Sequence, residues 1–192
     1  MPVTTRFREL IDRPEILPAM GGYDALSARL IERAGGEVVY MSGSSVSTSV
    51  HGYPDVGLTP MTEMVDRARG MASAVDVPVF CDADTGYGNP INVMRTVEEY
   101  ERAGVAGIHL EDQTFPKKCG HFEGKDVVPT GEMAGKIRAA TDAREDDDFV
   151  VVARTDARAV EGFERAVERA EAYLDAGADA LFVEAPTTRE EL

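Results

Sequence analysis

Residues 101–112 read Glu-Arg-Ala-Gly-Val-Ala-Gly-Ile-His-Leu-Glu-Asp, and in them a helical stretch stops at Gly104 and an apolar run follows at once. The same return through an Ala-Gly pair occurs within residues 32–40 and within residues 174–183. A left-handed glycine commonly closes a helix, and a short apolar run bounded by glycine is typical of a buried strand. Three such returns predict repeated βα units that build one sheet.

The same pattern extends over the whole chain as short apolar runs that alternate with helical stretches. Strands that are apolar on both faces are typical of a parallel sheet covered by helices. The predicted strands are Leu17–Met20, Val38–Met41, Val79–Asp82, Gly107–Leu110, Val150–Ala153 and Ala180–Val183. The predicted helices lie near Ala25–Ala34, Met61–Ala74, Ile91–Ala103, Gly131–Ala143 and Gly162–Ala176. No linker divides these elements, so we predict a single domain over residues 1–192.

Two α/β architectures fit this alternation, a doubly wound open sheet and a (β/α)8 barrel. An open sheet usually carries a glycine-rich phosphate loop after its first strand, but residues 20–24, Met-Gly-Gly-Tyr-Asp, lack the G-x-G-x-x-G spacing. Polar and acidic residues instead follow nearly every strand, as they do at the carboxyl-end face of a TIM barrel. Because a typical barrel has about 250 residues, we predict a TIM-type barrel with only about six βα units, incomplete at its C-terminal end.

Composition argues against several classes of function. The chain has 35 acidic and 20 basic residues, a net charge of −15, which repels the phosphates of nucleic acid. Its longest apolar run, Phe149–Ala153, is far shorter than the roughly 20 residues that span a bilayer, and the N-terminal residues lack the apolar core of a secretion signal. We therefore expect a cytoplasmic protein with no nucleic-acid or membrane partner, and with Cys81 and Cys119 as free thiols.

Carboxylates stand just beyond several of the predicted strands. Asp55 comes after the second strand, Asp82 and Asp84 lie at the end of the third, Glu111 follows the fourth and Glu184 the sixth. The carboxyl ends of barrel strands meet at one rim, where unpaired carboxylates would repel each other. Mg²⁺ relieves that repulsion, since it binds one or two carboxylates together with water and substrate oxygens. The alternative is that each acid caps a helix or pairs with an arginine.

A second cluster, Phe115-Pro116-Lys117-Lys118-Cys119-Gly120-His121, lies in a long polar segment after the fourth strand. A segment of this length can act as a mobile lid, and Gly120 and Gly124 permit hinge movement. Two lysines and a histidine favour the thiolate of Cys119, which can then exchange a proton near neutral pH. The alternative is an ordinary basic surface loop.

Two residues inside the strands have simpler interpretations. Cys81 is expected to fill the core, as buried cysteines usually do. His109 is either a core histidine or a support for the rim beside Glu111.

Taken together, these stretches resemble the isocitrate lyase/phosphoenolpyruvate mutase superfamily, and most of all its 2-methylisocitrate lyase and dimethylmalate lyase branches. The Lys-Lys-Cys-Gly-His run resembles the lyase branch, because the phosphonate-forming mutases lack that cysteine. The matching stretches are, in chain order, residues 40–43, 52–55, 82–88, 109–113, 117–121, 153–157 and 183–184.

The resemblance implies roles for individual residues. The metal, Mg²⁺ or alternatively Mn²⁺, would be bound by Asp82 with help from Asp55, Asp84 and Glu111. The catalytic residues would be Cys119 as general acid/base on the lid, Lys117 and His121 moving with it, and Tyr40 at the oxo-acid end of the substrate. The substrate-binding residues would be Ser42, Gly43, Asp82, Gly120, His121, Arg154 and Glu184.

The activity that the resemblance implies is carbon–carbon bond cleavage. A 2-hydroxy di- or tricarboxylate like 2-methylisocitrate would give an α-oxo acid, pyruvate or glyoxylate, plus succinate or a related acid. The resemblance also implies a homotetramer in the intact form, with C-terminal helices exchanged between subunits. Two alternatives stay open: an oxaloacetate decarboxylase or phosphonomutase on the same fold, and an inactive truncated barrel that serves only as an assembly partner or is a fragment.

Overall fold

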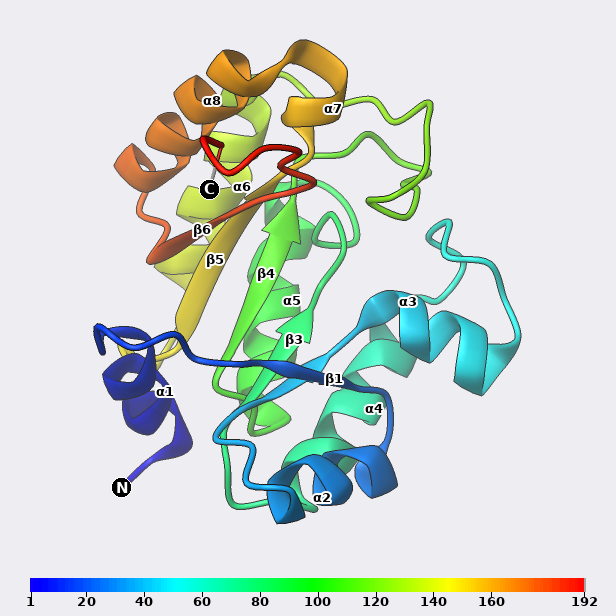
Figure 1. Ribbon diagram of the computed structural model, residues 1–192, viewed down its shortest axis with the longest axis vertical. Helices are drawn as coiled ribbons and strands as arrows, with labels where there is room; N and C mark the ends of the chain where they lie inside the picture. Colours follow the sequence, from blue (N-terminus) through cyan, green and yellow to red (C-terminus); the bar gives the residue numbers. More distant parts are fainter. Residues whose placement is uncertain (192) are drawn as a thin grey trace.

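Six parallel strands form one sheet in which neighbours in sequence are neighbours in space, in the order β1-β2-β3-β4-β5-β6 (Figure 1). The computed structural model describes residues 1–191. Its strands are β1 (Met20–Gly22), β2 (Val39–Met41), β3 (Val79–Asp82), β4 (Gly107–Glu111), β5 (Val150–Thr155) and β6 (Ala180–Val183). All five strand pairings are parallel.

This strand order decides between the two predicted architectures. A doubly wound sheet reverses its order at a switch point, whereas a TIM barrel adds each strand beside the one before it. The order here is sequential without reversal. The prediction of a TIM-type barrel with six βα units is therefore confirmed, and within residues 1–191 the free edges of the sheet are β1 and β6.

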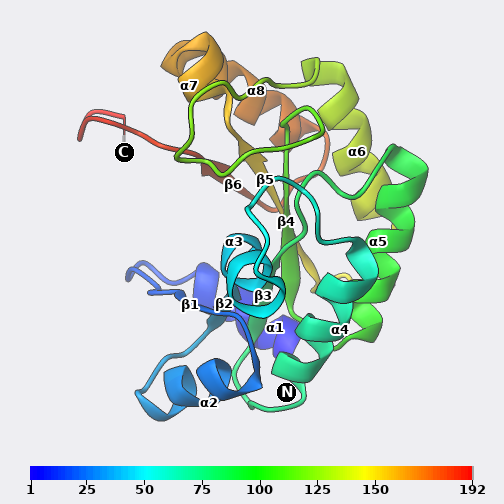
Figure 2. The same ribbon diagram turned by 90° about the vertical axis from the view of Figure 1, so that its right-hand side faces the viewer.

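Helices follow the strands and cover the sheet. They are α1 (Val3–Ile11), α2 (Ala25–Arg33), α3 (Gly43–Val46), the π-helix η1 (Ser47–His51), α4 (Met61–Ala72), α5 (Pro90–Arg102), α6 (Thr130–Ala143), α7 (Ala157–Glu161) and α8 (Phe163–Asp175). Figure 2 shows α4, α5 and α6 side by side along one face of the sheet. Within the described part of the chain, no helix has the length and apolar character needed to cross a membrane.

The helix ends agree with the predicted glycine returns. Gly35, Gly104 and Gly177 have φ values of +92°, +83° and +108°, in the region that glycine adopts without strain. At the other end of α5, the Asn89 side chain accepts hydrogen bonds from two backbone N–H groups of the first turn, and Pro90 occupies the first helical position. Such capping fixes where each helix starts and stops, and so where the strand ends lie.

The core occupies both faces of the central strands. β4 and β5 are buried along their whole length. In the main core cluster, Ile108 of β4 and the neighbouring Phe149 lie together with Tyr100 of α5. A smaller cluster joins α1 to the opposite end of the sheet from the strand carboxyl ends, where the Phe7 and Phe80 rings lie 5.4 Å apart. The buried Cys81 fills the core as predicted, and both cysteines are free thiols.

Some local predictions were wrong. The first strand is Met20–Gly22 and not Leu17–Met20, because Gly21 and Gly22 pair with Tyr40 and Met41. A β-carbon at Gly22 would lie 3.2–3.3 Å from the side chains around it, a tight contact at a position that the apolar pattern did not mark. α1, α3, η1 and α7 were not predicted. α3, η1 and α7 have five residues or fewer, too few to show a helical period, whereas the apolar residues 3, 7, 10 and 11 of α1 do have helical spacing.

Candidate active site

A cavity of about 320 Å³ lies at the carboxyl ends of the strands, between the sheet and the loop that joins β4 to α6. The predicted site residues that line it are Tyr40, Ser42, Asp55, Asp82, Glu111, Lys117, Cys119, Gly120, His121, Arg154 and Glu184. The other two predicted residues contact this lining: the Gly43 N–H donates to Asp82 Oδ2 at 3.2 Å, and Asp84 Oδ1 lies 2.7 Å from Lys117 Nζ. The fold thus brings all the predicted site residues together.

A larger cavity of about 660 Å³ lies between the ends of α4, α5 and α6. Its lining contains none of the predicted catalytic, substrate-binding or metal-binding residues. We therefore place the candidate active site in the smaller cavity, where titratable side chains from several strands converge.

Asp82 and Asp84 occupy one tight turn at the end of β3. The Asp84 N–H donates to Asp82 Oδ1 at 2.9 Å, and Asp84 has a left-handed φ of +48°, which is uncommon for a residue other than glycine. Burial, reinforced by the charge of Asp82, raises the pKa of Asp84 to about 6. Burial alone would raise the pKa of Asp82 as well, but nearby His109 and Lys117 outweigh it and lower that pKa. At this turn the carboxylate of Asp82 therefore stays charged at neutral pH, whereas that of Asp84 takes up a proton near pH 6.

His109 on β4 is fully buried beneath this turn. Its Nε2 lies 2.9 Å from the Tyr40 hydroxyl and 3.7 Å from Asp82 Oδ1. Burial lowers the pKa of His109 to about 4, so the ring is neutral at neutral pH. Burial and the charge of Asp82 also raise the pKa of Tyr40 well above its usual value. Both groups are therefore suited to hold neighbours by neutral hydrogen bonds rather than to carry charge.

Lys117 brings a positive charge from the loop into the acidic turn. Its ammonium lies 2.5 Å from Asp55 Oδ1 and 2.7 Å from Asp84 Oδ1, and the side chain is buried. Burial opposes the charge, but the surrounding carboxylates, Asp84 foremost, outweigh it and raise the pKa of Lys117. The carboxylates of this site thus require a cation close to them.

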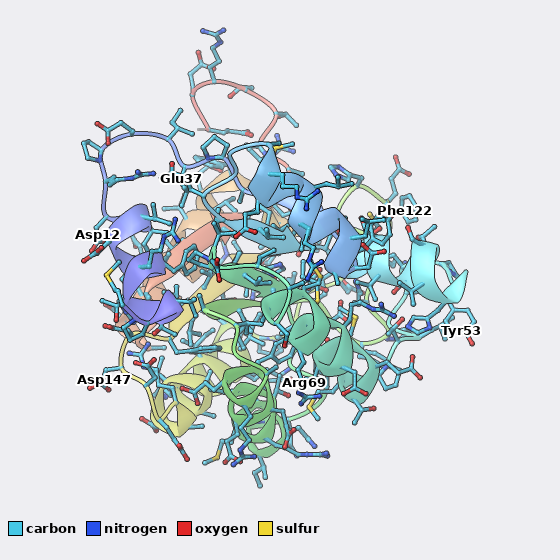
Figure 3. The ribbon with its side chains drawn as sticks, turned by 90° about the horizontal axis from the view of Figure 1, so that it is seen from below. Asp12, Glu37, Tyr53, Arg69, Phe122 and Asp147 are labelled. Carbon is cyan, nitrogen blue, oxygen red and sulfur yellow. The ribbon has the colours of Figure 1, made fainter. Side chains whose placement is uncertain are left out.

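The loop between β4 and α6, residues 112–129, is held at its base and bends over the cavity. Gln113 forms two 2.9 Å hydrogen bonds with the backbone of Lys118, and a bridge joins Gln113 to Val127. Cys119 lines the cavity and is partly exposed. Farther along the loop, exposed Phe122 lies toward the same side of the molecule as Tyr53 (Figure 3). The loop thus brings Cys119 into the lining of the same cavity as Asp82.

Arg154 on β5 forms the opposite wall. Its guanidinium makes two hydrogen bonds to Asp156, at 3.0 and 3.1 Å, and its carbon atom Cζ lies 5.3 Å from the centre of the Phe182 ring. Burial opposes its charge, but Glu111 and Asp156 outweigh burial and raise the pKa of Arg154. The charge of Arg154 is thus fixed toward the cavity.

Sequence reasoning missed three residues of this wall. Phe182 lies in the predicted sixth strand, but nothing in the sequence showed which of its faces is turned inward. Asp156 lies two residues after Arg154 in the matching stretch 153–157, where its residue type alone indicates no role. Lys125 lies in the predicted lid, and only the fold brings its ammonium to 3.1 Å from Asp156 Oδ1.

The donor set can be compared with what a metal ion needs. Within residues 1–191, no three His, Cys, Asp or Glu side chains form a ready-made metal site. Mg²⁺, however, usually takes only one or two protein carboxylates and completes its shell with water and substrate oxygens. Asp82 and Asp84 offer two carboxylates from one turn, and Glu111 Oε1 is buried without a hydrogen-bond partner. These residues fit an open Mg²⁺ or Mn²⁺ site and not an all-protein cage.

Comparison with known proteins identifies relatives along the chain. Residues 7–192 match the family described as phosphoenolpyruvate phosphomutase. The 2,3-dimethylmalate lyase of Eubacterium barkeri is 52% identical over 192 residues, which are 100% of this chain and 66% of that protein. A probable 2-methylisocitrate lyase of Corynebacterium glutamicum is 52% identical over 178 residues, 93% of this chain and 58% of that protein.

Solved structures give the same result. The trigonal crystal form of 2,3-dimethylmalate lyase, described as a PEP mutase/isocitrate lyase superfamily member, superposes with a TM-score of 0.93 at 43% identity, over 99% of this chain and 64% of that one. Phosphonopyruvate hydrolase in complex with oxalate and Mg²⁺ superposes with a TM-score of 0.89 at 38% identity, over 100% of this chain and 66% of that one.

The chain therefore spans less than two thirds of the length of these relatives. The matched region nevertheless covers nearly all of this chain, and the sequential parallel strands carry the predicted motifs at one rim. From the family match and these similarities together we conclude that the chain belongs to the phosphoenolpyruvate mutase/isocitrate lyase superfamily.

Proposed function

We propose that the chain carries the active site of a Mg²⁺-dependent carbon–carbon lyase. The substrate is a 2-hydroxy di- or tricarboxylate, with 2-methylisocitrate favoured, and the products are an α-oxo acid and succinate or a related acid. The observation that carries the proposal is that Cys119 lines the same cavity as Asp82 and Arg154. A proton donor, a carboxylate for the metal and a fixed positive charge are the three groups that this reaction needs.

Different site residues bind different parts of the substrate. Ser42 and Gly43, with Tyr40, hold the end of the substrate that becomes the oxo acid. Asp82 and Asp84 would hold the metal, and Arg154 receives a carboxylate of the departing acid. When bound, Mg²⁺ would lower the pKa of the substrate hydroxyl and withdraw negative charge from its oxygen.

The bond changes follow from these positions. The hydroxyl proton passes to the carboxylate of Glu111, which lines the cavity and whose Oε1 has no hydrogen-bond partner. The O–H electron pair forms the carbonyl of the oxo acid as the carbon–carbon bond breaks. The electron pair of that bond leaves on the departing acid, whose negative charge Arg154 offsets. The Cys119 thiol then donates its proton to that carbon, and the lid excludes water meanwhile.

The relatives support this choice of reaction. Two of them are named as lyases of 2,3-dimethylmalate and, as probable, of 2-methylisocitrate, and a structural neighbour contains Mg²⁺ with oxalate, a small dicarboxylate. We extend to this chain the use of a divalent metal and of a small carboxylate substrate. The homotetramer and the cytoplasmic location expected from the sequence belong to the same proposal.

The test is turnover of 2-methylisocitrate by the chain, followed as pyruvate release with Mg²⁺ and with EDTA. Loss of a positioned general acid costs about 10²–10⁴-fold in rate, so Cys119→Ser is expected to lose activity on that scale. Cys81→Ser is the matched control, since Cys81 is fully buried in the core. Full activity of Cys119→Ser contradicts the assigned proton donor.

Two further substrates separate the alternatives. Turnover of oxaloacetate to pyruvate and CO₂, or rearrangement of phosphonopyruvate, without cleavage of 2-methylisocitrate contradicts the lyase assignment. A folded chain with no turnover of any substrate and no Mg²⁺ binding by calorimetry favours an inactive assembly partner or fragment.

A further inference from the structure

We propose that Lys125 and Asp156 form a positioning pair that holds the lid closed and Arg154 in place in a single arrangement. The lid is here residues 117–125. This inference rests on the proposed function, because it assigns to Arg154 the binding of a substrate carboxylate.

Lys125, the first member of the pair, connects the lid to the barrel. Lys125 Nζ lies 3.1 Å from Asp156 Oδ1 and also donates a hydrogen bond to the Gly120 carbonyl. The side chain of Lys125 is 2% exposed and that of Asp156 is not exposed at all. A buried ammonium that touches both the peptide next to Cys119 and a barrel carboxylate fixes the position of the thiol-bearing segment.

The second half of the pair orients Arg154. Both oxygens of Asp156 accept hydrogen bonds from the Arg154 guanidinium, at 3.0 and 3.1 Å. The Asp156 backbone N–H in turn donates to Asp112 Oδ1 at 2.9 Å. A bidentate carboxylate–guanidinium contact fixes the plane of the guanidinium as well as its distance. Asp156 is therefore an anchored group that Lys125 and Arg154 share.

The charges at this wall explain why Lys125 is needed. Arg154 faces Glu111 Oε2 at 3.5 Å and Glu184 Oε2 at 3.7 Å in addition to Asp156. One buried guanidinium thus serves three acidic groups, and uncompensated buried charge is costly. Lys125 supplies the second positive charge, but only while the lid is closed.

Close packing makes lid closure and Arg154 placement depend on each other. A β-carbon on Gly120 would lie 2.6 Å from the Arg154 terminal nitrogen and closer still to the Glu184 carboxylate. The lid backbone therefore seats directly on the Arg154 side chain. If the guanidinium leaves this orientation, the lid backbone loses the side chain against which it packs. If the lid lifts, Asp156 loses its contact with Lys125 and keeps only Arg154 as a cationic partner.

The experiment uses three variants of the chain. Lys125→Met removes the ammonium, Lys125→Arg keeps a positive charge, and Asp126→Asn is the control, an adjacent exposed residue of the same loop. The measurements are hydrogen exchange of residues 117–125 by mass spectrometry, alkylation of Cys119 by iodoacetamide with buried Cys81 as internal reference, and kcat and KM for 2-methylisocitrate.

For Lys125→Met, loss of a buried charge contact predicts exchange and alkylation about tenfold faster than in the parent chain, with kcat/KM about tenfold lower and KM raised. Removal of a positive charge near a thiol would by itself slow alkylation, so faster alkylation reports an open lid. Lys125→Arg is expected to restore most of the protection, and Asp126→Asn is expected to match the parent chain.

Two outcomes overturn the pair. Parent-like exchange in Lys125→Met means that Lys125 does not hold the lid, and an open lid with unchanged KM and kcat means that Arg154 does not depend on it. A parent chain without turnover of 2-methylisocitrate contradicts the proposed function instead, and hydrogen exchange still decides whether Lys125 holds the lid.

Discussion

Lys117 Nζ lies 2.7 Å from Asp84 Oδ1, which joins the lid to the acidic turn after β3. The same ammonium lies 2.5 Å from Asp55 Oδ1. A buried positive charge between two carboxylates offsets a repulsion that the fold itself creates by bringing strand ends together. The lid is therefore held on the pocket by charge at Lys117 as well as at Lys125.

Replacement of Lys117 by Met should destabilise the metal-free chain. Removal of one partner from a buried ion pair leaves an uncompensated charge and costs about 3–5 kcal/mol. The loss is measured as the free energy of unfolding in urea with EDTA. Added Mg²⁺ should stabilise Lys117→Met more than the parent chain, because the variant has carboxylates left without a cation. Equal stabilisation of the two proteins by Mg²⁺ would count against a metal site at this turn.

A second prediction concerns pH and His109. The folded-state pKa of His109 is about 4, against 6.5 for the exposed side chain. Between these values the unfolded chain binds a proton that the folded chain does not, so stability rises with pH across this window and is lost as the pH falls. The shift corresponds to about 3 kcal/mol.

His109→Asn should remove this dependence. Asp84 contributes with the opposite sign, since its pKa is raised to about 6 and the folded chain there holds a proton that the unfolded chain releases. That contribution is present in both proteins. Because His109 also lowers the pKa of Asp82, the difference between them measures His109 together with its effect on Asp82. Urea unfolding in EDTA across the window is the measurement, and parallel curves for the two proteins would refute the buried neutral histidine.

The predictions that succeeded depend on local signals. The Ala-Gly returns placed three helix–strand junctions correctly because a left-handed glycine is a property of its own segment, as at Gly104. The position of the site at one rim could be predicted because parallel strands have all their carboxyl ends on one side of the sheet. Asp82 and Glu111 were therefore expected to lie close together, and both line the same cavity.

The predictions that failed depend on contacts between distant segments. Asp156 and Lys125 are a pair only because the lid folds back over β5, and no spacing in the sequence records that. Strand β1 includes Gly21 and Gly22 because its register is set by its pairing with β2. The apolar content of the sequence does not reveal that pairing. α1 is an exception, because Val3, Phe7, Leu10 and Ile11 have helical spacing in the sequence, and only its place against Phe80 depends on a distant contact.

A third prediction concerns Asp112, a fully buried carboxylate just outside the cavity. It accepts hydrogen bonds from Thr155 Oγ1 at 2.7 Å, from the Tyr173 hydroxyl at 2.8 Å and from the Asp156 N–H. Asp112→Ala leaves three buried donors without an acceptor and should cost about 3 kcal/mol or more in unfolding free energy. Tyr173→Phe removes one hydrogen bond to Asp112 and one that the hydroxyl accepts from Arg169, and should cost about 2 kcal/mol. Similar losses for the two variants would show that the bonds do not act as a set.

A fourth prediction uses Gly120, whose α-carbon lies against the Arg154 and Glu184 side chains. The β-carbon of Gly120→Ala would lie 2.6 Å from the Arg154 nitrogen, closer than atoms in contact approach, so either the lid or the guanidinium must shift. Misplacement of a binding group by about 1 Å can cost about 10²-fold in rate. We expect kcat/KM to fall on that scale while the midpoint of thermal unfolding stays near that of the parent chain, because the change lies in a loop over the cavity.

Gly131→Ala is the matched control for that variant. Gly131 lies in the first turn of α6, and no neighbouring atom lies within 4 Å of the point that an alanine methyl group would occupy there. Alanine is favoured over glycine in a helix by about 1 kcal/mol, so this variant should be slightly more stable with unchanged kinetics. If Gly120→Ala instead loses stability while kcat/KM is retained, the lid backbone is part of the folding core and not a movable cover. If both variants keep full activity, the seat of the lid on Arg154 is not required for turnover.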